Sequence, residues 1–203
     1  MADLAPETST DVAAYILAGG ASRRMGTDKV RLDLDGETVV QALARRFAAC
    51  TSGVSLVVKP WQDFADLGLP LLRDDAPGHA LVHGIRAALA CPGPEWRLLL
   101  ACDMPGVGPE ALVRLREAVR VHRAPGACFR RHDRADAEPL PSLWHRDIAG
   151  RIRESWGMTA RDWLRHAGIA VLGTSPTDAT LANINTPSEW RSYRDGGMAG
   201  EAG

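Results

Sequence analysis

The sequence predicts the α/β fold class, with a mostly parallel sheet between two layers of helices. From position 12 to about 125, short apolar runs alternate with longer stretches whose apolar residues have helical spacing, and this alternation is typical of strand–helix–strand units. The chain has 203 residues, of which 45% are hydrophobic and 24% charged. These values are those of a soluble globular fold.

The first predicted strand, Val12–Ala18, is short and apolar and is followed by Gly19-Gly20, which favours a buried strand. Val39–Ala49 has the apolar spacing of a helix. A second predicted helix, Ala80–Leu89, ends before a proline and a glycine, and a third, Pro109–Val121, begins with a proline, whose missing N–H costs nothing there. Three more apolar runs predict buried strands: Val54–Val58, Leu69–Leu72 and Leu98–Ala101.

Beyond Pro125 the alternation is less regular. The predicted elements are, in order, a strand at Ala127–Arg130, a strand at Leu140–Trp144, helices near Asp147–Trp156 and at Thr159–Ala167, a strand at Ile169–Leu172 and a helix from Pro187. No low-complexity linker or internal repeat interrupts the sequence. One domain over residues 12–194 is therefore predicted, with flexible ends at residues 1–11 and 195–203.

The charge balance argues against several classes of partner. The net charge is −1 with a pI near 6.6, and the cations are 22 arginines but only two lysines, Lys29 and Lys59. Nucleic acid is not expected as a partner, because non-specific affinity for it needs clustered positive charge. No apolar stretch approaches the roughly 20 residues of a membrane span. The four cysteines form no CxxC pair, so a cytoplasmic protein with reduced thiols is expected.

The loop after the first strand is rich in glycine and positive charge. Residues 17–29 read Leu-Ala-Gly-Gly-Ala-Ser-Arg-Arg-Met-Gly-Thr-Asp-Lys. Glycines let backbone N–H groups approach a phosphate, and the cations add charge. The spacing fits neither the GxGxxG fingerprint nor a Walker A loop, and a plain glycine turn with solvated arginines is the alternative. Since ligands of such sheets bind beyond the carboxyl ends of the strands, the loop is predicted to bind phosphate.

This loop resembles the signature Leu-Ala-Gly-Gly-x-Ser-x-Arg-Met-Gly-x-Asp-Lys of the MobA-type nucleotidyltransferases, and shorter motifs follow in the family's order as far as about Arg194. The resemblance implies a Rossmann-like fold with a nucleotide-binding half, residues 12–125, and an acceptor-binding half, residues 126–194. It implies catalytic roles for Arg24 and Lys29, with Lys29 on the phosphates. The nucleotide-binding residues carried over from the loop are Leu17, Ala18, Gly19 and Gly20. Related cytidylyltransferases tend to have Ala-Ala-Gly here, so the double glycine leans toward guanine.

Asp103 directly follows the predicted strand Leu98–Ala101, in the sequence Cys-Asp-Met-Pro. A carboxylate at this edge suits Mg²⁺, which is usually held by one or two carboxylates together with substrate phosphates. A helix N-cap or a turn aspartate before Pro105 is the alternative. In the family, the matching aspartate holds the metal and contacts the nucleotide, so Asp103 is the expected catalytic metal ligand. Cys102 has no activating partner and is interpreted as a small buried residue.

Two aspartates, Asp74 and Asp75, follow the predicted strand Leu69–Leu72. The resemblance gives Asp74 the contact with the guanine nucleotide, since a carboxylate can accept both the ring N–H and the amino group of guanine. The sequence leaves open which of the two faces the ligand and whether both are solvated. Lys59, included among the nucleotide-binding residues, stands where the family has an asparagine. Because lysine accepts no hydrogen bond, Lys59 is expected either to approach a phosphate or to leave the site.

The family's Gly-Pro-Leu-x-Gly segment is replaced by Gly-His-Ala-Leu-Val-His-Gly at residues 78–84. His79 and His83 are four residues apart, a spacing that lets two imidazoles share a metal on one helix face. No third ligand has matching spacing. We interpret the two histidines as ordinary polar helix residues.

The second half carries two shorter motifs. Glu138–Trp144 resembles the family's Pro-Leu-x-x-Leu-Tyr stretch, and residues 183–187 match its Asn-x-Asn-Thr-Pro motif. The resemblance implies that Asn185 is a further metal or acceptor contact and that Asn183 also binds the acceptor. Thr186 before a proline is typical of a helix N-cap. The arginine-rich loop 130–134 is either solvated or a contact for an anionic acceptor.

The resemblance implies an enzyme that transfers GMP from GTP to the phosphate of molybdenum-bearing molybdopterin, releases pyrophosphate and uses Mg²⁺. It also implies transient contact with molybdoenzymes or with other proteins of cofactor biosynthesis. Two alternatives remain: a related nucleotidyltransferase that uses CTP or a sugar phosphate, and a GTP-binding accessory protein without turnover. A dinucleotide-dependent dehydrogenase is the weakest alternative, because the glycine fingerprint is missing.

Overall fold

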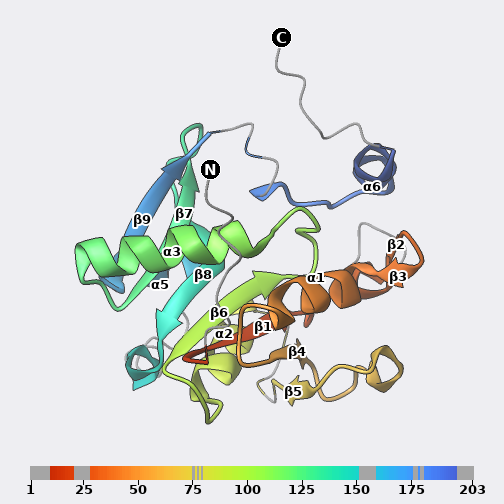
Figure 1. Cartoon of the computed structure of the whole chain (residues 1–203), viewed down its shortest axis with the longest axis horizontal. Coiled ribbons are helices and arrows are strands. Elements are labelled where there is room, and N and C mark those ends of the chain that lie inside the picture. The colour runs from red at the N-terminus through yellow and green to blue at the C-terminus, as the bar shows by residue number, and fades with distance from the viewer. Residues whose placement is uncertain are drawn as a thin grey trace.

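A seven-stranded sheet forms the centre of the computed structural model (Figure 1). The structure describes residues 10–20, 28–74, 76, 78, 80–150, 159–175, 178 and 181–195. The strand order is β5-β4-β1-β6-β8-β7-β9. These strands are β1 (Val12–Leu17), β4 (Val54–Val58), β5 (Leu71–Arg73), β6 (Trp96–Ala101), β7 (Gly126–Arg131), β8 (Glu138–His145) and β9 (Ala170–Thr174). Of the seven, β8 alone runs against its neighbours, so the sheet is mostly parallel, as predicted.

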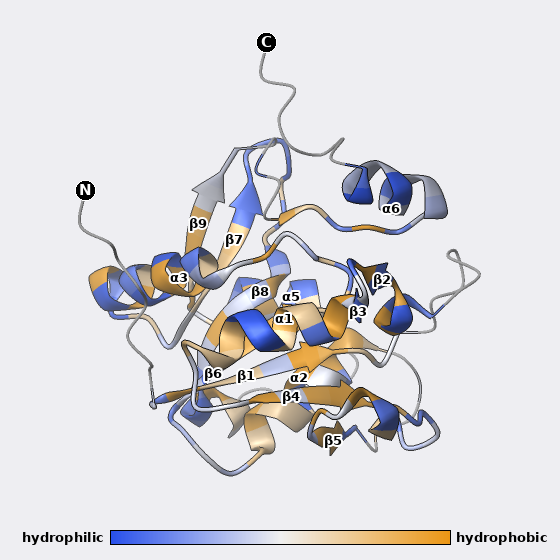
Figure 2. Cartoon of the chain, turned by 45° about the vertical axis from the view of Figure 1, so that its right-hand side comes forward, coloured by the Kyte–Doolittle hydropathy of each residue, from blue (hydrophilic) through white to orange (hydrophobic). Residues whose placement is uncertain are grey.

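Helices cover both faces of this sheet. α1 (Val39–Ala48) and α3 (Pro109–His122) lie on one face, and α2 (Leu81–Ala90) and α5 (Ala160–His166) lie on the other (Figures 1 and 2). Strand register explains why α2 and α5 share a face. Arg97 of β6 is opposite Trp144 of β8, so both side chains point to the same side of the sheet. Arg97 bonds to α2, and Trp144 stacks on Trp163 of α5 with ring centroids 4.4 Å apart. The predicted three-layer α/β/α class is confirmed.

The apolar residues of the sheet and of the inner helix faces form one core, in which Ile16, Leu43, Leu56, Leu98 and Phe129 are fully buried. Figure 2 shows the contrast between the hydrophobic central strands and the largely hydrophilic helix α6 (Pro187–Arg194). In the described part of the chain, no helix combines the length and the apolar character that a membrane crossing needs. All four cysteines are free.

Most predicted elements match the observed ones to within two residues. The expected helix near Asp147–Trp156 falls mostly on residues 151–158, outside the described residues; the structure describes the short helix η3 (Arg146–Ile148) at its start. The predicted flexible ends lie largely outside as well, at residues 1–9 and 196–203. The hairpin of β2 (Asp33–Leu34) and β3 (Glu37–Thr38) was not among the predicted elements. Its turn has positive φ at Asp35 and Gly36, for which an Asp-Gly pair is a known signal.

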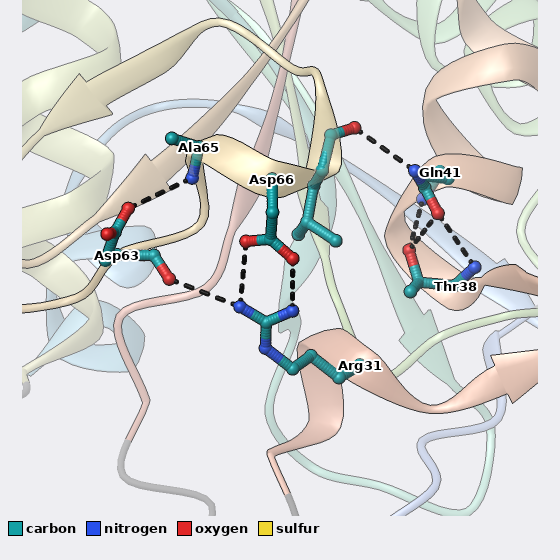
Figure 3. Close-up of polar contacts among 7 residues, drawn as sticks. Arg31, Thr38, Gln41, Asp63, Ala65 and Asp66 are labelled. Carbon is teal, nitrogen blue, oxygen red and sulfur yellow. Dashed lines mark hydrogen bonds and ion pairs between the residues drawn. The ribbon is translucent and has the colours of Figure 1, made fainter.

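The short helix η1 (Lys29–Arg31) is fastened to the segment that follows β4 (Figure 3). Arg31 donates hydrogen bonds to both carboxylate oxygens of Asp66, at 2.5 and 2.9 Å, and one to the carbonyl oxygen of Asp63 at 3.3 Å. Gln41 completes a capping box with Thr38 at the start of α1, and its side-chain amide donates to the carbonyl oxygen of a residue in the same segment at 3.2 Å. These contacts fix the turn that carries Lys29.

Arg97 closes the carboxyl-terminal end of α2. It is 1% exposed, and its guanidinium donates to the backbone carbonyl oxygens of Ala88 at 3.3 Å, of Cys91 at 2.6 Å and of Pro94. The end of a helix leaves carbonyl groups without helical partners. Arg97 supplies donors to this region from the neighbouring strand, and it thereby joins α2 to the sheet.

Replacing Arg97 with methionine is expected to lower the free energy of unfolding by about 2–4 kcal/mol, because one buried and two half-buried carbonyl groups lose a donor. Arg120→Met is the matched control, since Arg120 is 74% exposed and its partner Glu117 lies on the same surface helix. That control is expected to leave stability nearly unchanged. Urea unfolding followed by circular dichroism measures both variants, and equal losses would contradict this role of Arg97.

Candidate active site

A cavity of about 810 Å³ opens beyond the carboxyl ends of the parallel strands. One wall is formed by the ends of β1, β4 and β6, by the residue after β5 and by the start of α2; the other is formed by the start of β8, the start of α5 and the segment before α6. Its size lies in the range of small-molecule sites. Its place is the one where open α/β sheets bind ligands.

The glycine loop forms the first part of this cavity. Leu17, Ala18, Gly19 and Gly20 all line it, and binding of phosphate by their backbone stays a prediction. Gly84 of α2 lets the helix approach β1 closely, because a Cβ atom there would lie 3.1 Å from Leu17 Cδ2. Arg24 lies among residues 21–27, outside the described residues, so its catalytic role stays a prediction.

Three residues that are far apart in the sequence meet in the cavity. The Lys29 ammonium lies 2.8 Å from Asp103 Oδ2 and 2.9 Å from Asn185 Oδ1. They come from η1, from the turn after β6 and from the segment before α6. The backbone supports this meeting, since the N–H of Ile184 donates to the carbonyl oxygen of Asp103 at 2.8 Å. The structure thus brings together the predicted phosphate cation and both predicted metal ligands.

The turn that carries Asp103 is held from the side of α1. Arg46 donates to the carbonyl oxygens of Pro105 and Val107, which lie just after Asp103 in the chain. The helix that follows, α3, has Gly108 as its N-cap, so Asp103 is not the cap of that helix. Its carboxylate faces Lys29, and its side chain is 23% exposed.

Asp103 and Asn185 form a suitable donor set for a divalent metal. Their oxygens already converge on one cation, the Lys29 ammonium, and carboxylate and amide oxygens are the ligands that Mg²⁺ accepts together with substrate phosphates. Within the described residues, no group of three or more His, Cys, Asp or Glu side chains is placed to hold a metal. His79 lies outside them, and the buried Nδ1 of His83 has no hydrogen-bond partner within them.

Lys59 differs from both sequence expectations. It lines the cavity but pairs with Asp74, and its ammonium lies 2.7 Å from Asp74 Oδ2 with 1% and 5% of the two side chains exposed. The ammonium also donates to the carbonyl oxygen of Ala76 at 2.9 Å. Asp74 is therefore the buried cavity aspartate and not a solvated one, whereas Asp75 lies outside the described residues.

Cys102 lines the cavity beside Asp103. Burial raises the pKa of its thiol to about 12, the charge of Asp103 adds to this shift, and the charge of Lys29 opposes it. Nucleophilic cysteines need a thiolate at neutral pH. The raised pKa agrees with the expectation that Cys102 is no nucleophile, but the residue is half-buried at the cavity and not the buried residue that was expected.

The wall opposite the glycine loop contains a cation that the sequence analysis missed. Arg161, at the start of α5, lines the cavity together with Glu138 of β8 and with Asn183 and Asn185. Nothing distinguished Arg161 in the sequence, because it is one of 22 arginines and belongs to no motif. The loop 130–134, which did stand out, is absent from the described lining, and its Arg131 pairs with Asp133 at 3.0 Å.

Thr186 caps α6, as predicted. Its hydroxyl accepts a hydrogen bond from the backbone N–H of Glu189, and the Glu189 carboxylate accepts one from the N–H of Thr186. The same carboxylate accepts the N–H of Asn185 at 2.6 Å. The cap therefore also fixes the backbone that presents Asn185 to Lys29.

Comparison with known proteins identifies the family. A model described as a MobA-like NTP transferase domain matches residues 14–171. The probable molybdenum cofactor guanylyltransferases of Nostoc sp. and Synechococcus elongatus are 32% and 34% identical to this chain. These alignments cover 88% and 90% of this chain and 88% and 97% of the relatives.

Solved structures agree on the fold. Molybdopterin-guanine dinucleotide biosynthesis protein A from Archaeoglobus fulgidus is 19% identical and matches with a TM-score of 0.73 over 93% of this chain and 100% of that chain. CMP:2-keto-3-deoxy-manno-octonic acid synthetase, solved with CTP, is 14% identical and matches with a TM-score of 0.72 over 93% and 99% of the two chains. The chain belongs to the MobA-like NTP transferase family.

Proposed function

We propose that the chain is a molybdenum cofactor guanylyltransferase, which transfers GMP from GTP to the phosphate of molybdenum-bearing molybdopterin and releases pyrophosphate. Its curated relatives carry that name. The observation that carries the proposal is the meeting of Lys29, Asp103 and Asn185 in a cavity of about 810 Å³ beside a glycine loop. This arrangement offers charge and oxygen ligands where a triphosphate would lie.

The proposed nucleotide site occupies the half of the cavity built from residues 12–125. The backbone at residues 17–20 faces the phosphates, and Asp74 faces the base, whose N–H groups a carboxylate can accept. The acceptor then occupies the half built from residues 126–194, between Arg161 and Asn183. This division places the two reacting phosphates next to Asp103.

The chemistry requires no general base, because the acceptor phosphate is already ionised near pH 7. One of its oxygens attacks the α-phosphorus of GTP, the bond from that phosphorus to the bridging oxygen breaks, and pyrophosphate leaves with the electron pair. Lys29 provides positive charge for the leaving pyrophosphate, and the loop N–H groups orient the triphosphate. We propose that Asp103 and Asn185 hold Mg²⁺, which when bound neutralises phosphate charge.

Pyrophosphate release tests this function. The protein is assayed with GTP, CTP, ATP and UTP in turn, with and without the molybdopterin acceptor. Release with GTP that depends on the acceptor is the expected result. Release with CTP in place of GTP would identify a cytidylyltransferase, and GTP binding without release would identify an accessory protein. Contact with molybdoenzymes and a cytoplasmic location stay predictions.

Asp103→Asn is expected to lower turnover by about 10²–10³-fold, because the charged ligand of the proposed Mg²⁺ is lost and with it the metal's stabilisation of the transition state. GTP binding is expected to weaken less than turnover, since loop and base contacts remain. Asp147→Asn is the control, with a side chain that is 79% exposed and paired with His145 on the surface. Steady-state pyrophosphate release and isothermal titration with GTP give the two quantities. Normal turnover in Asp103→Asn would remove Asp103 from the mechanism.

Arg161→Ala is expected to raise the KM for the acceptor by about tenfold or more, because a charge-assisted contact to an anion is lost. The KM for GTP is expected to stay unchanged. Arg165→Ala on the same helix is the control, since Arg165 is 58% exposed and pairs with Asp136 and Asp162. An increase confined to the KM for GTP would show that Arg161 contacts the nucleotide and not the acceptor, and would contradict this prediction.

Cys102→Ser is expected to leave turnover within about threefold of the wild type, because the thiol takes no part in the proposed chemistry. Burial raises the pKa of the Cys102 thiol to about 12, so very few of these side chains are thiolates at pH 8. Iodoacetamide at pH 8 should therefore leave Cys102 unmodified, as peptide mass spectrometry can show. Rapid alkylation of Cys102 with matching loss of turnover would contradict this account.

A further inference from the structure

The buried ion pair between Lys59 and Asp74 has no part in the phosphate chemistry described above. Its ammonium and carboxylate are 2.7 Å apart, and both side chains are almost completely buried. A buried pair seldom increases stability over an apolar pair, because both charges lose their hydration. Since Lys59 and Asp74 also line the cavity, a role in ligand recognition is the better explanation for the pair.

Lys59 joins three segments of the cavity wall. Its ammonium bonds to Asp74 and to the carbonyl oxygen of Ala76, beyond β5. Its backbone N–H donates to the side-chain oxygen of Gln62 at 2.8 Å, and the Gln62 amide donates to the carbonyl oxygen of Ala18 at 3.3 Å. The lysine stem runs under Gly19, where a Cβ atom would lie 3.7 Å from it. The side chain therefore connects the glycine loop to the Asp74 carboxylate.

The Asp74 carboxylate is fixed at both oxygens. Oδ2 pairs with Lys59 at 2.7 Å, and Oδ1 accepts the backbone N–H of Ala76 at 3.1 Å. The backbone N–H of Asp74 itself donates to Val58 at 2.8 Å. A carboxylate has about four acceptor positions, and its contacts with the described residues take up two of them. Because the group is held from two sides, its orientation is defined.

We infer that Lys59 is a specificity-determining positioning residue, which holds Asp74 as an oriented anion that selects a base with two adjacent N–H donors. The inference rests on the proposed function for the identity of that base. Guanine presents its ring N–H next to its amino group, whereas adenine and cytosine present an amino group next to a ring acceptor. A fixed carboxylate attracts the first pattern and repels the ring acceptor of the second.

Without Lys59 the carboxylate would lose its counter-charge in a buried position. It would then take up a proton or turn toward solvent, since an isolated buried charge is strongly disfavoured. In either state it is no longer an oriented anion. Base selection should therefore fall, while the phosphate chemistry around Lys29 and Asp103 continues.

The test compares Lys59→Met with the wild type and with Arg73→Met. Arg73 is the residue before Asp74, and its exposed side chain donates to the carbonyl oxygen of Pro60 at 3.0 Å, so this control removes a neighbouring charge outside the buried pair. Titration calorimetry measures binding of GTP, ATP and ITP, whose base lacks the amino group. Pyrophosphate release gives kcat at saturating GTP.

The wild type and Arg73→Met are expected to bind GTP about tenfold more tightly than ITP, the difference of one charge-assisted hydrogen bond. Lys59→Met is expected to bind GTP at least about tenfold more weakly, with a GTP-to-ITP affinity ratio near one and kcat within about threefold of wild type. A purely structural role of Lys59 would weaken both nucleotides equally and keep the ratio. An unchanged ratio therefore overturns the inference.

Lys59→Gln provides the second variant. It retains an N–H donor toward Asp74 without the charge, and its expected GTP-to-ITP ratio lies between those of wild type and Lys59→Met. If Lys59→Met does not fold, this variant carries the test, and a wild-type ratio in Lys59→Gln overturns the inference. If the wild type releases pyrophosphate but binds GTP and ITP equally well, the inference about Lys59 is wrong and the proposed function stands. If the wild type prefers GTP but releases no pyrophosphate, the proposed function is wrong and the inference stands.

Discussion

The site depends on one constraint: the neighbouring parallel strands β4, β1 and β6 end in register at the same edge of the sheet. β1 pairs with β4 and β6 so that Leu17 is opposite Val57 on one side and Ala101 on the other. The residues that follow these strands therefore reach the same edge of the sheet. Beyond that edge the chain turns into α2, and it turns again after β6. The glycine loop, Lys59 and Asp103 therefore line one cavity. A shift in register would separate them.

Charge is organised around this edge in two buried or half-buried pairs. Both lysines of the chain take part, Lys29 with Asp103 at 2.8 Å and Lys59 with Asp74 at 2.7 Å, although arginine outnumbers lysine elsewhere. A lysine ammonium is a compact charge on a flexible stem, whereas an arginine fork needs a planar partner and more room. The first pair gathers the oxygens that suit a metal and a triphosphate. The second, we propose, orients the carboxylate that meets the base.

Much of the fold could be predicted from the sequence, because buried strands and amphipathic helices are local patterns. The hairpin around Asp35 and Gly36 could also have been predicted from its Asp-Gly turn, but it was not. The site residues Lys29, Asp103 and Asn185 could be named from motifs, and the structure adds that they touch. The partner of Lys59 and the position of Arg161 could not be predicted, since they depend on where β5 ends beside β4 and on how α5 packs against β8. No sequence motif marks Asp74 as the partner of Lys59 or Arg161 as a residue of the cavity, because the chain contains many aspartates and arginines.

A crystal structure of the protein with Mg²⁺ and a non-hydrolysable GTP analogue would show where the nucleotide and the metal bind. We expect the triphosphate against residues 17–20, Lys29 turned from Asp103 to the phosphates, the metal on Asp103 and Asn185, and the base against Asp74 with Lys59 still paired. A nucleotide bound elsewhere, or bound in this cavity with Lys29 still on Asp103 and no metal there, would contradict this expectation.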